Sequence, residues 1–341
     1  MYRLSVIALI VVAAVLPAAS AGAALPPRIA YDTDDGRVHV ESVDGTVTAS
    51  VWNASPYFSF SGGLLAVARP TLNGGSRVVG IDAATGTWQL IWKDAFFPLV
   101  AGRGAGVIFL PDAHAGGPDD RDPTLNSVWY RDANSSHIHR LVQFKDSDLI
   151  PLNLATSPKG GRVAITEGND ADLFQWDIWT AATGVHRVRR LTTDGVSNYP
   201  SFSPSGMRIA FTKVSHTHPC SGSVWIMAAD GRNPQRLVAG SCARHFLRPV
   251  WLNTQTLIAW AWGPHGVLGL VKIDARSGAV TPLVNGRVFD FSVSRAMGKV
   301  AIRYRSGRVG LWDAGDDALT LLPVTPPGSR VFLSGGLELA Y

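Results

Sequence analysis

The stretch at residues 200–211 reads Pro-Ser-Phe-Ser-Pro-Ser-Gly-Met-Arg-Ile-Ala-Phe. It predicts a β-strand, a tight turn and a second β-strand, because proline fixes φ at a turn and glycine supplies the positive φ that the turn needs. Variants of this phrase recur at residues 56–67, 97–109, 152–165, 249–260 and 289–302. The recurrence indicates a repeat protein.

A second element follows each copy of the phrase. It is a β-rich run that ends in a polar turn, as in Val-Trp-Ile-Met-Ala-Ala-Asp-Gly at residues 224–231, and one more short strand follows, as at residues 235–238. The turn glycines lie at positions 45, 86, 184, 231, 278 and 315. The unit between positions 86 and 184 has its polar turn at residues 133–136, without a glycine. Four short strands in a unit of about 40–50 residues are typical of a β-propeller.

The ends of the chain predict how the ring closes. Units begin near residues 28, 56, 97, 151, 198, 247 and 288, which gives seven blades, or six or eight if the weak third or seventh unit is misread. Residues 28–31 enter the first blade at its second strand, and residues 330–341 form another first-strand phrase. We therefore expect residues 330–341 to pair beside residues 29–31, which removes an open sheet edge. The predicted fold is all-β, with one propeller domain over residues 24–341.

The first 23 residues have the layout of a secretory signal peptide. Arg3 precedes an apolar run at residues 4–16, Pro17 breaks the run, and small residues at 19–23 offer a cleavage site. The run is shorter than the roughly 20 residues that a membrane span needs, although an uncleaved anchor stays open as an alternative. We expect an extracytoplasmic mature protein without a membrane span.

Composition narrows the class of protein. Hydrophobic residues make up 46% and charged residues 17% of the chain, and this balance excludes intrinsic disorder. The net charge of +5 comes without a block of Lys and Arg of the kind that marks a nucleic-acid patch. We expect a monomer with no nucleic-acid partner.

Cys220 and Cys242 are the only cysteines. In an oxidising compartment pairing is the default, and the sequence has no CxxC or zinc-type spacing. The two residues lie in loops predicted to open on the same face of the ring, so we expect a Cys220–Cys242 disulfide.

The segment Leu-Thr-Thr-Asp-Gly at residues 191–195, the phrase at 199–211 and the run at 224–237 together resemble the repeat of the TolB-like β-propeller family. The resemblance is close in this unit, fair over residues 150–193 and loose elsewhere. It implies a periplasmic or secreted interaction scaffold. Similar blades cover the active sites of prolyl-oligopeptidase-type peptidases and occur in some sugar lyases. The matching residues are turn and core residues, so the resemblance transfers no site residue.

Histidines mark one candidate binding face. In a propeller, the loops from the second to the third strand and from the fourth strand to the next blade share one face. The residues predicted there are His114, His216, His218, His245 and His265, with Trp262 beside them. The plainer alternative is a set of solvated loop histidines.

We expect no bound metal and no other cofactor. No regular spacing links the histidine loops, although His-x-His at His216 and His218 is a plausible metal pair. Two acidic loops are predicted, but they lack the ordered ligands and glycine of an EF-hand and are expected to be solvated. Their residues are Asp112, Asp119, Asp120 and Asp122 in one loop, and Glu167, Asp170 and Asp172 in the other.

Two classes of function remain. The Gly-x-Ser-x-Gly motif of serine hydrolases and the glycine patterns of P-loop and Rossmann proteins are absent from the sequence, so we assign no catalytic residue. The favoured hypothesis is a non-catalytic propeller that binds a protein, peptide or glycan at one face. The alternative is a propeller enzyme, such as a metal-assisted lyase or a hydrolase, that uses loop His and Asp.

Overall fold

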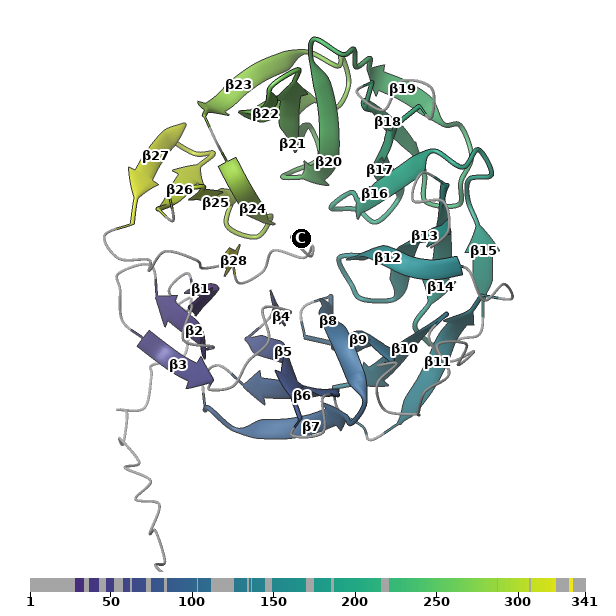
Figure 1. The fold of residues 1–341 in the computed structure, drawn as a ribbon, viewed down its shortest axis with the longest axis vertical. Coiled ribbons are helices and arrows are strands. Elements are labelled where there is room, and N and C mark those ends of the chain that lie inside the picture. Colours follow the sequence, from purple (N-terminus) through teal and green to yellow (C-terminus); the bar gives the residue numbers. More distant parts are fainter. Residues whose placement is uncertain are drawn as a thin grey trace, which may run out of the picture.

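The computed structural model describes residues 28–33, 37–42, 47–51, 58–61, 63–71, 75–82, 85–102, 104–111, 126–133, 135, 137–144, 149–169, 175–184, 187–215, 221–286, 288–306, 308–322 and 331–333. These residues form seven four-stranded antiparallel sheets arranged as the blades of a ring (Figure 1). The predicted count of seven is confirmed. The proposed signal peptide lies outside the described residues.

The strands fall into blades 1 to 7 in chain order. Blades 1 to 3 contain β28 (Val331–Leu333), β1 (Arg28–Thr33), β2 (Arg37–Ser42) and β3 (Val47–Val51); β4 (Phe58–Ser61), β5 (Leu64–Pro70), β6 (Ser76–Asp82) and β7 (Trp88–Trp92); and β8 (Ala95–Ala101), β9 (Gly106–Pro111), β10 (Ser127–Asp132) and β11 (Ile138–Gln143). Blades 4 and 5 contain β12 (Leu149–Thr156), β13 (Arg162–Asn169), β14 (Trp176–Ala182) and β15 (Val188–Arg190); and β16 (Ser197–Phe202), β17 (Arg208–Lys213), β18 (Ser223–Ala228) and β19 (Gln235–Val238). Blades 6 and 7 contain β20 (His245–Trp251), β21 (Thr256–Gly263), β22 (Gly266–Asp274) and β23 (Val280–Asn285); and β24 (Val288–Ser294), β25 (Lys299–Tyr304), β26 (Val309–Asp313) and β27 (Ala318–Leu321).

The hydrophobic core lies between blades rather than inside them. Alternate residues of a strand point to opposite faces of its sheet, so each blade presents an apolar face to both neighbours. In β13, Ile165 packs with Leu99 and Ile108 of blade 3, whereas Ala164 packs with Phe202 of blade 5. Burial of these faces therefore requires the neighbouring blades.

Tryptophans of the third strands belong to the same contacts. Trp129 and Trp179 stand opposite Arg140 and Arg190 on the fourth strands, and the guanidinium groups lie 6.0 and 5.7 Å from the ring centroids. The repeated pair shows that these blades share one packing scheme at their outer edges.

The ring closes through blade 1. β28 pairs antiparallel with β1, with Ile29 opposite Leu333 and Tyr31 opposite Val331. The predicted pairing with residues 29–31 is confirmed for residues 331–333, and the rest of the phrase at residues 330–341 lies outside the described residues. The first strand of blade 1 thus comes from the far end of the propeller sequence and covers the edge that β1 would otherwise expose.

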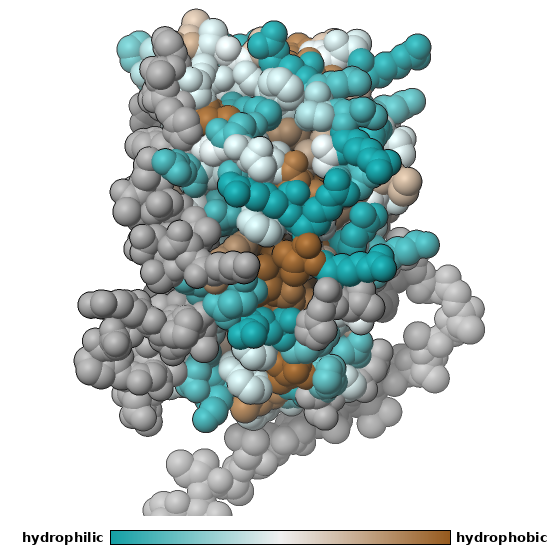
Figure 2. Space-filling model, turned by 90° about the vertical axis from the view of Figure 1, so that its right-hand side faces the viewer, coloured by the Kyte–Doolittle hydropathy of each residue, from teal (hydrophilic) through white to brown (hydrophobic). Residues whose placement is uncertain are grey.

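The outer surface beside β15 and β19 is largely hydrophilic, with small hydrophobic patches between the polar side chains (Figure 2). All three residues of β15 are exposed. In the part of the chain that the structure describes, no helix is long and apolar enough to cross a membrane.

Candidate binding face

The loops from second to third strands and from fourth strands to the next blade leave the same ends of the strands. We call this side of the ring the loop face and the other side the opposite face. Of the predicted face residues, His245, Trp262 and His265 are described, and all three belong to blade 6. His114, His216 and His218 lie outside the described residues.

The structure brings His245 and Trp262 together. They are direct partners in the register of β20 and β21, and their rings stack with centroids 6.2 Å apart and planes 28° from parallel. His245 is only 7% exposed, and this burial lowers the pKa of its imidazole. His245 is thus a buried aromatic partner of Trp262 rather than a solvated loop histidine.

His265 occupies a different environment at the tip of the β21–β22 hairpin. Gly263 pairs with Gly266, which leaves Pro264 and His265 as the two turn residues, and His265 is exposed. Gly266 has φ of +105°, a conformation that glycine adopts without strain. The turn therefore presents His265 to solvent on the loop face, three residues beyond the half-buried Trp262.

The segment that carries Cys242 borders this site. Ser241, Cys242 and Arg244 are exposed immediately before His245. The backbone at Gly240 lies close against the backbone at Gly222. A Cβ atom on Gly240 would lie only 2.0 Å from the carbonyl oxygen of Gly222. Cys220 itself lies outside the described residues, so its pairing with Cys242 stays a prediction.

The innermost strands carry bulges that were not predicted from the sequence. Phe97, Tyr199 and Arg248 each have positive φ, between 46° and 53°, each precedes a proline, and each sits where the pairing of the first and second strands shifts register. Bulges of this kind re-aim side chains, and non-glycine residues seldom adopt this backbone conformation. The ring thus uses a repeated local distortion at its inner wall.

In blade 6 the bulge directs Arg248 toward blade 7. Arg248 Nη1 donates to Asp290 Oδ1 at 2.8 Å, and the two side chains are 6% and 2% exposed. Nη2 donates to the Phe291 carbonyl oxygen at 3.2 Å, and the guanidinium lies 5.2 Å from the Trp260 ring centroid. This buried ion pair connects two blades and leaves little of Arg248 available to a ligand.

The acidic loops need one correction. Glu167 was predicted in a loop, but it lies inside β13 and is buried, and Trp179 Nε1 donates to its Oε2. The β13–β14 pairing extends past Glu167 to Gly168, which explains why the residue is structural. Asp112, Asp119, Asp120, Asp122, Asp170 and Asp172 lie outside the described residues. Within the described residues, no three His, Cys, Asp or Glu side chains are placed to hold a metal ion.

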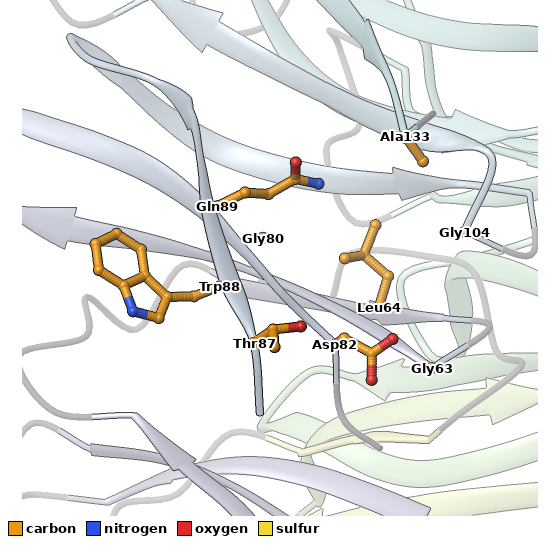
Figure 3. Close-up of a pocket in the computed structure, with 9 residues that line it drawn as sticks. All are labelled: Gly63, Leu64, Gly80, Asp82, Thr87, Trp88, Gln89, Gly104 and Ala133. Atoms are coloured by element: carbon orange, nitrogen blue, oxygen red, sulfur yellow. The ribbon is translucent and has the colours of Figure 1, made fainter. Parts of the chain in front are cut away.

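Grooves between adjacent blades mark the opposite face. The one between blades 2 and 3 has a volume of about 420 Å³. Figure 3 shows Gln89 on one side of β7, with Leu64, and Trp88 on the other. Asp82 is the acidic group of this groove, and its Oδ1 accepts the backbone N–H of Thr85 at 2.8 Å. This hydrogen bond shows that the Asp82 carboxylate stabilises the turn between β6 and β7.

His137 and His139 lie in a similar groove between blades 3 and 4 and were missed at the sequence level. The residues predicted from the sequence lie in loops of the loop face, whereas His139 lies in β11 and His137 immediately precedes this strand, on the opposite face. The His-x-His spacing was the available signal, because residues two apart in a strand share a face.

The buried His245 predicts a dependence of stability on pH. Its lowered pKa means that the unfolded chain binds a proton more readily than the folded one, so stability is complete above the ordinary pKa of about 6.5 and declines as the pH falls below it. We expect the denaturation midpoint of His245→Phe to lose part of this acid dependence. His265→Asn, at the exposed turn, is the control and should retain the wild-type profile. Identical profiles for His245→Phe and wild type would contradict the assignment.

No family model matches the chain, and no curated protein matches its sequence. Solved structures do match. They include the tricorn protease, with TM-score 0.66, 12% identity and coverage of 89% of this chain and 34% of the protease, and oligogalacturonate lyase in complex with manganese, with TM-score 0.61, 10% identity and coverage of 87% and 84%. A TolB-type protein of Agrobacterium tumefaciens matches with TM-score 0.51, 12% identity and coverage of 74% and 94%.

At these identities the likeness concerns the fold. The matched structures are a protease, a lyase and a TolB-type protein, so the fold alone does not determine the activity. The blade pattern of the sequence, the seven sheets of the described residues and these matches agree. The chain has the fold of a TolB-like β-propeller.

Proposed function

We propose that this protein is a non-catalytic, extracytoplasmic β-propeller that binds a protein or peptide partner through the loop face around blade 6. In this proposal residues 1–23 are a signal peptide and residues 24–341 form one propeller domain. The supporting observation is the grouping of the His245–Trp262 stack, the exposed turn of His265 and the exposed segment before His245 on one side of blade 6.

The proposed binding surface consists of accessible loops that the rigid strands of blade 6 hold in place. Binding residues are concentrated on loops held by a stable scaffold, and aromatic side chains with a polar edge suit protein interfaces. Leu268, on the same hairpin as His265, is 46% exposed and adds apolar area. The surface therefore combines an apolar residue, an imidazole and the cation of Arg244.

The test is capture of a partner from the extracytoplasmic fraction of the source cells by cross-linking and mass spectrometry. We expect His265→Glu and Leu268→Ala to reduce recovery of the same partner without changing the thermal midpoint. Met207→Ala is the matched control, because Met207 is 67% exposed on the β16–β17 turn of the opposite face. A partner that both loop-face variants retain would contradict the proposal.

The enzyme alternative makes a different prediction for the same preparation. It requires loop His and Asp side chains to act on a substrate, and supporting it would take turnover of a peptide or an acidic glycan by the purified protein. Turnover that is lost on substitution of His216 or His218 would replace the binding proposal with this alternative. A glycan bound without turnover at the loop face would change the partner class only.

A Cys220–Cys242 disulfide is part of the proposal. The chain at Gly222 and Gly240 is in contact, and Gly240 N donates to Ser223 Oγ at 3.0 Å, which brings the segments that lead to both cysteines side by side. A bridge between Cys220 and Cys242, which are 22 residues apart in the sequence, stabilises by roughly 3 kcal/mol in the chain-entropy model. We expect no reactive thiol in the denatured, unreduced protein and weaker partner binding by the Cys220→Ser/Cys242→Ser double variant. Two reactive thiols would rule the bridge out.

A further inference from the structure

The groove between blades 3 and 4 on the opposite face gathers six polar side chains. It has a volume of about 340 Å³ and is lined by Tyr130, Asp132, Ser135, His137, His139, Thr183 and Gly184. The two imidazole rings lie with their centroids 5.4 Å apart, and the His139 ring meets the Tyr130 ring edge-on at 5.5 Å. The histidines therefore stand together inside one groove rather than in separate loops.

Hydrogen bonding sets the tautomer of His139. Its Nε2 lies 2.7 Å from the carbonyl oxygen of Thr183 in blade 4, and a carbonyl oxygen only accepts, so Nε2 carries the hydrogen. In the neutral ring the lone pair is then on Nδ1. Metal-binding histidines usually donate their second N–H to a carbonyl or carboxylate in this way, which fixes the orientation of the ring. The contact with Thr183 therefore fixes the ring of His139 and leaves Nδ1 as the nitrogen that a metal ion would take.

The distance between the rings fits a shared metal ion. Metal–nitrogen bonds of about 2.0–2.1 Å place each ring centre roughly 3.2 Å from the ion, and a tetrahedral angle then separates two ring centres by about 5.2 Å. The observed 5.4 Å is close to that value. His137 is exposed, so rotation of its side chain is free to turn a nitrogen toward the ion.

The surrounding groups favour a cation and leave coordination positions to water. Tyr130 Oη donates to the Ala105 carbonyl oxygen at 3.0 Å. This hydrogen bond uses the phenol proton, so Tyr130 is not counted among the ligands. Asp132 adds a negative charge at the groove, which attracts a divalent cation.

We propose that His137 and His139 bind one divalent transition-metal ion in this groove, with copper(II) preferred over nickel(II) and zinc(II). Two imidazoles suit all three ions, and the order follows their general affinity for nitrogen ligands. With two protein ligands the site is exchangeable rather than structural. It lies on the face opposite the proposed partner surface, so the two proposals succeed or fail separately.

The test is a titration of mature protein without a polyhistidine tag with copper(II), followed by calorimetry and by electron paramagnetic resonance. We expect one saturable site whose spectrum shows nitrogen coupling. We expect His137→Asn to lower its affinity by at least about tenfold, which is the smallest loss that even outer-shell substitutions cause at metal sites. Because His137 is exposed, this variant should fold as the wild type does.

His139→Asn is the second variant and should weaken binding as strongly. His265→Asn is the matched control, since it removes an exposed histidine from the loop face, and it should bind copper(II) with wild-type affinity. Wild-type affinity in His137→Asn, absence of saturable binding, or loss of binding in His265→Asn would each overturn the proposal.

Discussion

Replacement of Asp290 by alanine is expected to lower the free energy of unfolding by about 3–5 kcal/mol, the usual cost of removing one partner of a buried ion pair. The substitution leaves the Arg248 guanidinium buried without its carboxylate, at a site where the two side chains are 6% and 2% exposed. Chemical denaturation of the purified protein, followed by tryptophan fluorescence, measures the change. Because the pair connects blades 6 and 7, the loss should appear in the main cooperative transition.

Two controls separate charge burial from a general loss of contacts. The double variant Arg248→Met/Asp290→Leu removes both charges and should recover much of the stability, since apolar replacements of buried pairs are often neutral or better. Arg232→Ala removes one partner of an exposed pair whose Nε–Oδ2 distance is 3.5 Å and should cost less than about 1 kcal/mol. An equal loss in Asp290→Ala and Arg232→Ala would show that the Arg248 contact does not stabilise the fold.

Truncation after residue 330 is expected to remove several kcal/mol of the roughly 5–15 kcal/mol that stabilises a typical folded domain. The shortened chain lacks β28, which pairs with β1 and also packs against β24, β25 and β4. The exposed edge of β1 then becomes available for pairing with other chains. A lower denaturation midpoint and concentration-dependent aggregation, measured by light scattering, are the expected results.

A chain that ends at Leu333 provides the matched control. It retains all of β28 and should keep the midpoint of the full chain. If the chain ending at residue 330 were as stable and as soluble as this control, closure of the ring through β28 would not be needed for stability.

The architecture could be predicted because it follows from local signals. Turns with Pro and Gly recur at a nearly constant interval, and alternation within each strand sets its two apolar faces. The orphan phrase at residues 330–341 sufficed to predict closure, which the pairing of Ile29 with Leu333 confirms. The sequence therefore predicts those features of the structure that repeat from one blade to the next.

The site was harder to predict because it depends on contacts between distant residues. Arg248 meets Asp290 where a bulge in β20 turns it toward the next blade. The proline that follows Arg248 marks the position of this bulge in the sequence, but it does not identify the partner on the next blade. Glu167 looked like a loop residue until the extent of β13 was known. His137 and His139 did have a visible spacing, but their value depends on the Thr183 carbonyl oxygen of another blade.

Ring closure also has a kinetic consequence. Blades 2 to 7 each form from strands that are consecutive in the chain, so their contacts are local and form early, whereas blade 1 must wait for β28. Non-local pairings are slow because the chain loses loop entropy before the contact is made. We therefore expect an open ring with an unpaired β1 to be the last intermediate in folding, and the time spent in that state to set the yield of soluble protein.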